Sequence, residues 1–192
     1  MDTEEGILAV KTARDFISSE TGGPFIGSDL PKSFNSNSGV FVTLNTFPGN
    51  ELRGCIGIPE PIYPLYESLE YAARSACHDP RFMDLQFSEL DDITVEVTIL
   101  TTPETVQVDR DSLIDWIVIG KHGLIIEGRG KRGLLLPQVP EELGWDQIDY
   151  LEGLCRKAGL KRGSWRDSDI KLYFFEGEVF SEIEPYGPVE RR

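Results

Sequence analysis

The segment Leu52–Ile58 most strongly limits the folds open to this chain, because its residue types alternate and two glycines interrupt it. It reads Leu-Arg-Gly-Cys-Ile-Gly-Ile, so large apolar side chains fall only at even-numbered positions. Successive side chains of a strand point to opposite faces, so this pattern predicts a strand on which Arg53 and Cys55 share one face. Glycine within a strand marks a bulge or the close approach of a ligand, which makes Gly54 and Gly57 candidate ligand-contact residues.

Arg53 and Cys55 are the first functional candidates in this strand. A thiol beside a fixed positive charge ionises more readily, and the thiolate is the reactive form, so Cys55 is a candidate nucleophile or thiol donor. The alternative is a small residue that packs well in a glycine-rich strand. Arg53 is a candidate to hold a phosphate or carboxylate with two parallel hydrogen bonds. The alternative for Arg53 is an ion pair with an acid such as Glu96.

Glu96 and His78 are further catalytic candidates. Glu96 stands between two threonines on the polar face of a predicted strand over 93–100, where it would be a general base if that face lines a cleft. The ordinary strand pattern favours a solvent-facing residue instead. His78 lies in the last turn of a predicted helix, which favours a structural role at the negative end of the helix dipole. It would serve Cys55 as a base only if the fold brings the two together.

The charge of the chain opposes nucleic-acid binding. The formal net charge is −14, and binding to nucleic acid depends on neutralising phosphates with basic side chains. Residues 110–166 are the exception, with ten basic and eight acidic side chains, whereas the rest of the chain has nine basic and 25 acidic ones. Solvated surface charge is the favoured interpretation of this stretch, and a small anionic ligand bound there is the alternative. The charge makes nucleic-acid binding the weakest function class.

Cysteine and histidine usage predicts neither a disulfide scaffold nor a metal site. The three cysteines, Cys55, Cys77 and Cys155, are widely spaced and form no CxxC pair, which argues against disulfides and against a zinc knuckle. The two histidines, His78 and His122, are far apart in the sequence. Cys77 and Cys155 fall at or near apolar helix stripes and are predicted to be core residues. No motif for S-adenosylmethionine, flavin, nicotinamide or ATP is present, so the cofactor remains open.

The sequence also predicts a cytoplasmic protein without membrane contact. No apolar run approaches the about 20 residues that a membrane-spanning helix needs. The first residues are acidic, whereas a secretory signal has a positively charged start followed by an apolar stretch.

Periodicity predicts an α+β fold. Helical spacing is found from residues 2–3 to the glycine–proline break at 22–24, over 64–78, from 111–112 to 116, and over 141–158 with Gly144 as a candidate break. Strand patterns cover 40–44, 93–100, 117–119, 124–126, 134–136 and 172–180, and the tail from 182 is predicted to fray. The turn over 46–51 predicts that the strand over 40–44 forms an antiparallel hairpin with Leu52–Ile58. Most strands follow one another directly, which favours a mainly antiparallel sheet with flanking helices over a doubly wound parallel sheet.

Six segments together resemble the AMMECR domain family, which is found in archaea, bacteria and eukaryotes. Leu52–Gly57 is similar to the family signature, Leu-Arg-Gly-Cys-Ile-Gly. The other matching segments are Asp79–Phe82, Gly120–Leu124, Gly133–Pro140, Gly144–Asp146 and Lys157–Leu160. The match follows nearly the whole chain in the expected order, so residues 1–192 are predicted to form a single domain of an archaeal or bacterial member.

The resemblance implies an α+β fold of two packed lobes with a cleft between them, whose boundaries the sequence does not set. It implies no settled activity, but it implies Memo-type and radical S-adenosylmethionine-type (radical SAM-type) proteins as partners. Two functions therefore stay open. One is an enzyme or enzyme-accessory protein that binds an anionic or nucleotide-like ligand in a cleft at Arg53 and Cys55. The other is a non-catalytic protein-binding or scaffold module.

Overall fold

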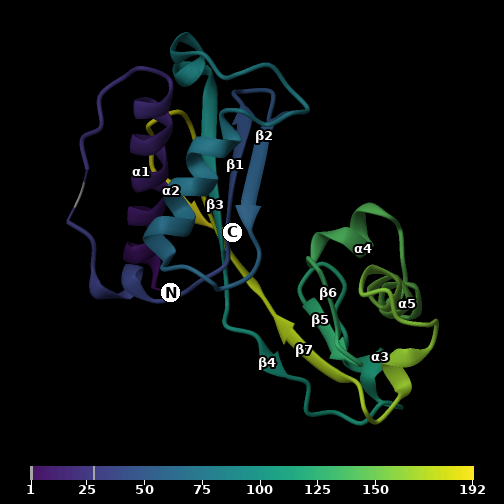
Figure 1. Ribbon diagram of the computed structural model, residues 1–192. Coiled ribbons are helices and arrows are strands. Elements are labelled where there is room, and N and C mark those ends of the chain that lie inside the picture. The colour runs from purple at the N-terminus through teal and green to yellow at the C-terminus, as the bar shows by residue number, and fades with distance from the viewer. Residues whose placement is uncertain (1, 28) are drawn as a thin grey trace. The chain divides into compact units, whose positions relative to one another are not determined.

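The computed structural model describes residues 2–27 and 29–192 and has an α+β fold with two separate sheets (Figure 1). The predicted fold class is confirmed. The chain divides into two compact units, each with its own apolar core. Unit 1 combines the chain up to Leu100 with Glu178–Arg192, and unit 2 is Thr101–Gly177. Among the described residues, no helix is both long and apolar enough to cross a membrane.

A five-stranded sheet forms the centre of unit 1, with the glycine-containing strand at its edge. Its strands, in spatial order, are β2 (Leu52–Ile58), β1 (Val40–Thr46), β3 (Ile93–Leu100), β8 (Gly177–Glu182) and β9 (Val189–Arg191). The pairing of β1 with β2 is antiparallel, as the sequence predicts for this hairpin, and β1 also pairs antiparallel with β3. Because β2 is an edge strand, half of its backbone groups need partners outside the sheet.

Two helices cover one face of this sheet, and they lie side by side in Figure 1. They are α1 (Thr3–Glu20) and α2 (Leu65–Ala76), and short 3-10 turns occupy Lys32–Asn35 (η1) and Phe87–Asp92 (η2). The core under the helices includes Phe16, Leu69 and Ala73 together with Val42, Leu44, Val95 and Val97 of the sheet. Alternation along the strands therefore directs Thr43 and Cys55 to the opposite face, which we call the outer face.

A buried ion pair ties α1 to the sheet. Arg14 pairs with Glu182, and its Nε lies 3.1 Å from Glu182 Oε1. The guanidinium also donates to the carbonyl oxygens of Leu90, at 3.0 Å, and Ile93, at 2.8 Å. Glu182 in turn accepts the Val95 N–H at 2.9 Å. The network therefore joins α1, η2, β3 and β8 through hydrogen bonds that water does not reach.

Unit 2 consists of a four-stranded sheet and short helices. In spatial order its strands are β4 (Glu104–Thr105), β7 (Lys171–Phe175), β5 (Gly123–Gly128) and β6 (Lys131–Leu135). The helices are α3 (Leu113–Trp116), α4 (Gln138–Glu142), α5 (Gln147–Lys157) and the 3-10 turn η3 (Ser164–Arg166). Trp165, Tyr150 and Leu154 are fully buried in its core. Cys155 is buried here and Cys77 in unit 1, as predicted.

One predicted element of unit 2 is wrong. Residues 117–119 form no strand, because the chain turns after α3 and the Val118 carbonyl accepts the N–H groups of Lys121 and His122. The helix predicted over 141–158 is interrupted at its candidate break, Gly144, and forms the two helices α4 and α5. Gly144 adopts a left-handed backbone with φ of 63°, and the Asp146 side chain caps α5 by accepting the Asp149 N–H at 2.8 Å.

The end of the chain also differs from the prediction. The single strand predicted over 172–180 is divided at Glu176, so that β7 belongs to one sheet and β8 to the other. The tail does not fray, because β9 pairs antiparallel with β8. The chain reverses at Tyr186, which has a positive φ of 58°, and the Ile183 N–H donates to the Pro188 carbonyl across the turn.

Candidate functional site

The structure brings Cys55 and Glu96 into one row across the outer face. Cys55 of β2 lies opposite Thr43 of β1, and Thr43 lies opposite Glu96 of β3. Thr43 Oγ1 donates to Cys55 Sγ at 3.3 Å. Cys55 and Thr43 form a non-hydrogen-bonded pair of the ladder, the kind in which opposed side chains lie closest. Two of the three predicted catalytic residues therefore share one surface, with a threonine between them.

The loop after α2 holds the backbone of Cys55 at the free edge of the sheet. The Cys55 N–H donates to Asp79 Oδ2 at 2.9 Å, and Arg81 Nη2 donates to the Cys55 carbonyl at 3.3 Å. Arg81 Nη2 also pairs with Asp79 Oδ2 at 2.6 Å, and Arg81 Nε donates to Asp79 Oδ1 at 3.0 Å. Asp79 and Arg81 thus occupy the two positions that a further strand would fill beside Cys55.

Sequence reasoning missed Asp79 and Arg81 as site residues. From sequence alone, Asp79-Pro80 marks only the end of the helix predicted over 64–78, since a residue before proline leaves helical geometry. The segment Asp79–Phe82 was noted only as part of the family resemblance. The spacing of an acid and an arginine across a proline is the signal that would have found them. Asp79 is buried, and an aspartate is almost never fully buried unless its carboxylate is paired.

The Cys55 thiol is not activated by its surroundings. Burial raises its pKa and is the largest influence, and the negative charges of Asp79 and Glu96 act in the same direction. The Thr43 hydrogen bond and the positive charge of Arg81 oppose that rise. The cation that acts on the thiol is therefore Arg81, whereas the sequence analysis assigned that effect to Arg53. The structure favours a protonated Cys55 near neutral pH.

Arg53 is engaged by a carboxylate of its own unit. Its Nε and Nη2 donate to Glu89 Oε1 and Oε2 at 2.9 and 3.1 Å, the two-bond geometry that the sequence analysis assigned to an external anion. The side chain is only 15% exposed. Arg53 also holds the pKa of Glu89 below its usual range. The ion-pair alternative therefore describes Arg53 best, with Glu89 of η2 as the acid instead of Glu96.

Glu96 is not the solvent-facing residue that the strand pattern favours. Its side chain is 18% exposed, and Arg192 Nη1 lies 3.2 Å from Oε2. Burial raises the pKa of Glu96, and Arg192 opposes that rise. A raised carboxyl pKa is common in general acid–base groups, and the catalytic role of Glu96 stays a prediction.

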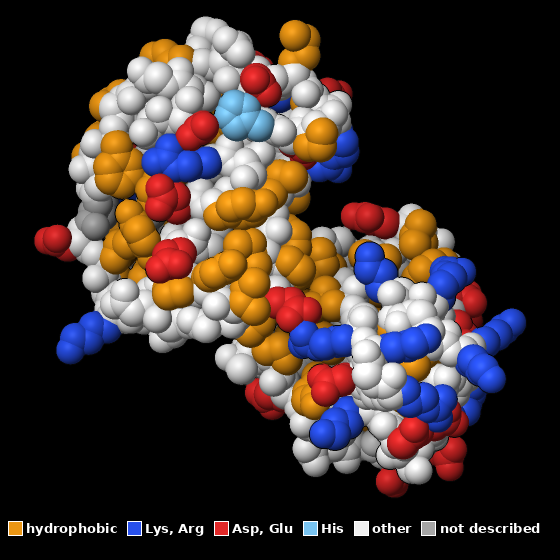
Figure 2. Space-filling model, in the orientation of Figure 1, with side chains coloured by type: hydrophobic (Ala, Val, Ile, Leu, Met, Phe, Trp, Pro, Cys, Tyr) orange, Lys and Arg blue, Asp and Glu red, His pale blue; other side chains and the backbone are white. Residues whose placement is uncertain are grey.

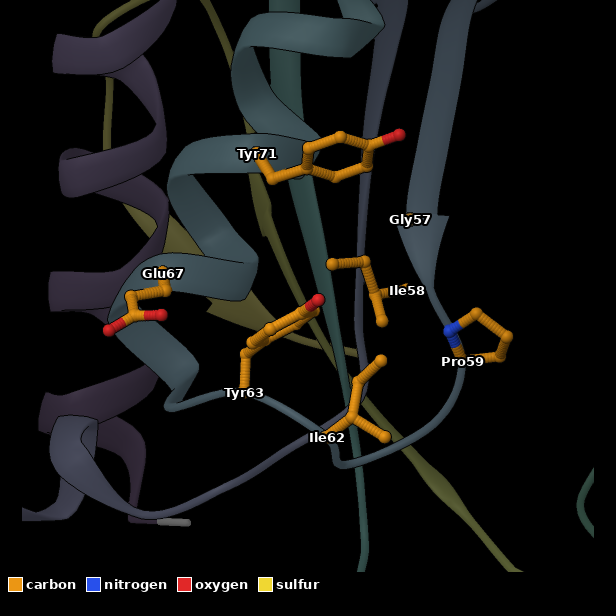
Figure 3. Close-up of a pocket in the computed structure, with 7 residues that line it drawn as sticks. All are labelled: Gly57, Ile58, Pro59, Ile62, Tyr63, Glu67 and Tyr71. Atoms are coloured by element: carbon orange, nitrogen blue, oxygen red, sulfur yellow. The ribbon is translucent and has the colours of Figure 1, made fainter.

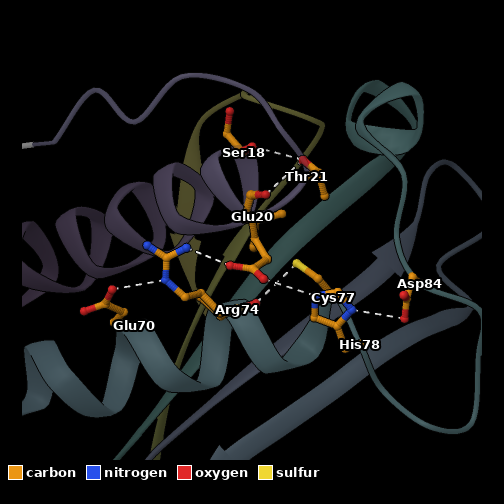
Figure 4. Close-up of polar contacts among 10 residues, drawn as sticks. Ser18, Glu20, Thr21, Glu70, Arg74, Cys77, His78 and Asp84 are labelled. Atoms are coloured by element: carbon orange, nitrogen blue, oxygen red, sulfur yellow. Dashed lines mark hydrogen bonds and ion pairs between the residues drawn. The ribbon is translucent and has the colours of Figure 1, made fainter.

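His78 lies in a network of carboxylates (Figure 4). Its Nδ1 is 3.0 Å from Asp84 and its Nε2 is 3.1 Å from Glu20, which also pairs with Arg74. Asp84 and then Glu20 raise the pKa of the exposed imidazole. Because both ring nitrogens face carboxylates, the geometry supports the structural role and does not support a base for Cys55.

Close packing explains both glycines of the signature strand. A Cβ on Gly54 would lie 2.4 Å from the Ala76 carbonyl oxygen, so glycine lets the end of α2 pack on β2. A Cβ on Gly57 would lie 2.4 Å from both the Phe41 ring and the Val40 carbonyl oxygen. Their contact with a ligand stays a prediction.

A groove opens between the end of β2 and the exposed side of α2 (Figure 3). Its volume is about 530 Å³. It is lined by Gly57, Ile58, Pro59, Ile62, Tyr63, Glu67 and Tyr71. Sequence reasoning missed it, although aromatic residues outside the apolar stripe of a helix are a usable signal. Among the described residues, no three His, Cys, Asp or Glu side chains are placed to hold a metal ion.

Thiol alkylation tests the state of Cys55. We expect Cys55 to be modified first, since it alone of the three cysteines is partly exposed, but with a pH midpoint above the about 8.5 of a free thiol. Cys77, whose pKa burial raises to about 12, and Cys155 should react only on unfolding. Peptide mass spectrometry after timed iodoacetamide treatment separates the sites. A Cys55 midpoint well below that of a free thiol would contradict this assignment.

Comparison with known proteins identifies the family. The AMMECR1 family matches residues 10–180. Protein MJ0810 of Methanocaldococcus jannaschii is 50% identical over 189 residues, covering 97% of this chain and 94% of that protein. A protein of Aquifex aeolicus is 49% identical, with 84% of each chain covered. The crystal structure of PH0010 from Pyrococcus horikoshii, described as uncharacterized, matches with a TM-score of 0.77 and 42% identity, covering 100% of this chain and 98% of that one. The chain therefore belongs to the AMMECR1 family.

Proposed function

We propose that this protein is a protein-binding module whose contact surface is the groove between β2 and α2. The observation that carries the proposal is a contrast along one strand. At Arg53 and Cys55 the polar groups are paired within unit 1, whereas the other end of the strand borders exposed aromatic and aliphatic side chains. Apolar side chains are visible on the surface of unit 1 over α2 and β2 (Figure 2).

The composition of the groove supports contact with a protein. Tyrosine is enriched where proteins bind one another, because its ring adds contact area and its hydroxyl adds a hydrogen bond. Tyr63 and Tyr71 are 48% and 55% exposed, and Ile62 is 58% exposed. Exposed apolar groups that converge on one groove mark an interaction site more than apolar residues scattered singly. The family resemblance makes Memo-type and radical SAM-type proteins the first partners to test.

A ligand-binding or catalytic site on the outer face is the second candidate function. The observation that favours it is the row of Cys55, Thr43 and Glu96, in which two groups have raised pKa values. The ligand would meet a thiol and a carboxyl group whose burial favours their neutral forms. Arg81, with a side chain 55% exposed, would be the cation available to an anionic group, since Arg53 is already paired.

Partner binding by variants separates the two candidates. We expect the double variant Tyr63→Ala/Tyr71→Ala to weaken binding of a Memo-type or radical SAM-type protein by about tenfold or more, the effect of losing interface hot spots. Cys55→Ser and Glu96→Gln should leave the affinity unchanged. Ile183→Ala serves as the control, because Ile183 is exposed in the same unit but outside the groove. Calorimetry on purified proteins gives the affinities.

The opposite pattern would overturn the proposal. If Cys55→Ser or Glu96→Gln abolished binding of a partner or a metabolite while the tyrosine variant behaved like wild type, the outer face would be the functional surface. Thermal unfolding of each variant must be recorded alongside, so that a loss of fold is not scored as a loss of contact.

A further inference from the structure

We propose that the groove between β2 and α2 binds an extended peptide segment of the partner and selects a lysine or arginine side chain on it. This inference rests on the proposed function and specifies the kind of segment recognised. It is carried by free backbone groups at the strand edge, by two tyrosine rings, and by an unpaired carboxylate, all within unit 1.

The backbone groups belong to Gly57. Cys55 donates its N–H outward to Asp79, so the pair Cys55–Thr43 lies at a non-hydrogen-bonded position of the ladder. Such positions alternate along an antiparallel pair, so Gly57, two residues on and opposite Phe41, also points its N–H and C=O outward. Among the described residues, neither group of Gly57 has a hydrogen-bond partner outside the ladder. One residue of an extended peptide fits there by accepting and donating one hydrogen bond.

The structure also limits how far such a peptide can pair. Asp79 and Arg81 already occupy the outward groups of Cys55, and Pro59 has no N–H to donate. Pairing is therefore confined to Gly57, where it forms a single two-bond bridge. A bridge of that size gives little affinity by itself, so side chains in the groove must supply selectivity.

Those side chains favour a cation. The rings of Tyr63 and Tyr71 enter the groove from the loop before α2 and from α2 itself (Figure 3). Glu67 of α2 is one of the residues that line the same groove, and its carboxylate has no ion pair or hydrogen bond among the described residues. A cation over an aromatic face is attracted by the ring, and a nearby carboxylate adds to that attraction. A lysine or arginine stem would cover the rings while its charged end reaches Glu67.

The charge of unit 1 points to the same occupant. Its sequence holds 20 acidic and eight basic side chains, a net charge of −12. This field raises the association rate of a basic segment and repels acidic or phosphorylated ones. A Cβ on Gly57 would point toward Phe41 on the outer face, so the peptide residue that bridges Gly57 also directs its side chain to the outer face. Because side chains alternate, the cationic side chain belongs to the next residue of the peptide, which faces the groove.

Short peptides test the inference on the full chain. The probe is acetyl-Thr-Val-Lys-Val-Thr-amide, with matched peptides that carry norleucine or glutamate in place of lysine. Titration into nitrogen-15-labelled protein should shift the amide signals of Gly57, Ile62, Tyr63, Glu67 and Tyr71. The order of affinity expected is lysine, then norleucine, then glutamate. The amide nitrogen of each valine is methylated in turn. Methylation of the valine that bridges Gly57 should abolish the shift of Gly57, because it removes the donor of the bridge.

A matched pair of protein variants isolates the role of Glu67. Glu67→Gln should weaken the lysine peptide by about two- to fivefold, the range of an exposed ion pair, and leave the norleucine peptide unchanged. Glu51→Gln removes an equal charge from an exposed position of the same unit and should change neither. If both variants weaken binding equally, the net charge of the unit and not the groove selects the peptide, and the inference is overturned.

Two further outcomes would also overturn it. One is the absence of shifts at the groove up to millimolar lysine peptide. The other is a concentration-dependent shift of the same signals without peptide, which would assign the groove to a second copy of this chain. Neither outcome decides the proposed function. If partner binding still depends on Tyr63 and Tyr71, the module binds through this groove by another mode, and if it does not, both proposals fail.

Discussion

Replacement of Arg14 by leucine is expected to lower the free energy of unfolding by about 3–5 kcal/mol, the range for removing one partner of a buried ion pair. The guanidinium joins Glu182 to the carbonyl groups of Leu90 and Ile93. Leucine fills much of the volume but donates nothing, so one carboxylate and two carbonyl oxygens lose their partners in a place that water does not reach. A buried group without a partner retains the full penalty of its desolvation.

Arg74→Leu is the matched control for this prediction. Arg74 is also a helical arginine with two carboxylate partners, Glu20 and Glu70, but its side chain is 35% exposed. Exposed ion pairs stabilise by about 0–1 kcal/mol, so this variant should remain near wild type. Urea unfolding followed by circular dichroism gives both values. Equal losses in the two variants would show that burial does not set the strength of the Arg14 network.

The double variant Arg14→Leu/Glu182→Leu tests whether the ion pair alone accounts for the stability that the network contributes. Removing both charges takes away the uncompensated carboxylate, so the double variant should be more stable than Arg14→Leu. It should still be less stable than wild type, because Leu90, Ile93 and Val95 keep backbone groups that lost their partners. Full recovery would mean that those backbone groups find water or shift to new partners.

Local sequence patterns were sufficient to predict the strands in which one face is apolar and the other polar. The strand over 93–100 was predicted with its observed bounds, since its apolar residues alternate with threonine and glutamate. The hairpin of β1 and β2 followed from a turn between two such strands. The strand predicted over 172–180 shows the limit. Its apolar run over 172–175 stops at Glu176-Gly177-Glu178 and resumes at Val179. That the residues on either side pair in different sheets is decided only by non-local contacts.

The candidate site shows the same limit. Alternation along β2 predicted correctly that Cys55 leaves the helix-covered face, but it carries no information on which charge lies near the thiol. That charge is Arg81, which is 26 residues away in the sequence and is brought back to β2 by the loop after α2. The partner of Arg53 is Glu89, in a 3-10 turn that the periodicity did not predict. Ion-pair partners follow from tertiary packing, so a sequence pattern supplies the candidates and not the choice.

Replacement of Asp79 by alanine is the second change with a large expected effect, a loss of about 2–3 kcal/mol in the free energy of unfolding. Hydrogen bonds to a charged acceptor set the size of this loss. The loss is reduced because the Arg81 side chain is partly exposed and recovers hydration when its partner is removed. The buried carboxylate accepts the Cys55 N–H and three N–H groups of Arg81. Without this carboxylate, the Cys55 N–H at the edge of β2 has no acceptor. The Arg81 side chain then loses its ion pair.

The contribution of Asp79 to the free energy of unfolding should depend on pH. The hydrogen bonds from Arg81, and then those from backbone N–H groups, hold the pKa of the Asp79 carboxyl well below its usual range. A depressed folded-state pKa stabilises the fold above the ordinary aspartate pKa of about 3.9, and that contribution is lost as the pH falls toward the folded-state value. The stability difference between wild type and Asp79→Asn should therefore be largest near neutral pH and shrink in acid.

Urea unfolding between about pH 7 and pH 3 measures that difference, with Asp84→Asn as the control. Asp84 is an exposed carboxylate of the same loop that pairs with His78, so its replacement should have little effect. Hydrogen exchange adds a local measurement, since the Cys55 amide should exchange faster in Asp79→Ala than in wild type. If the exchange rate of that amide did not change, the carboxylate would not be its partner in solution, and the role of Asp79 in holding the edge of β2 would be wrong.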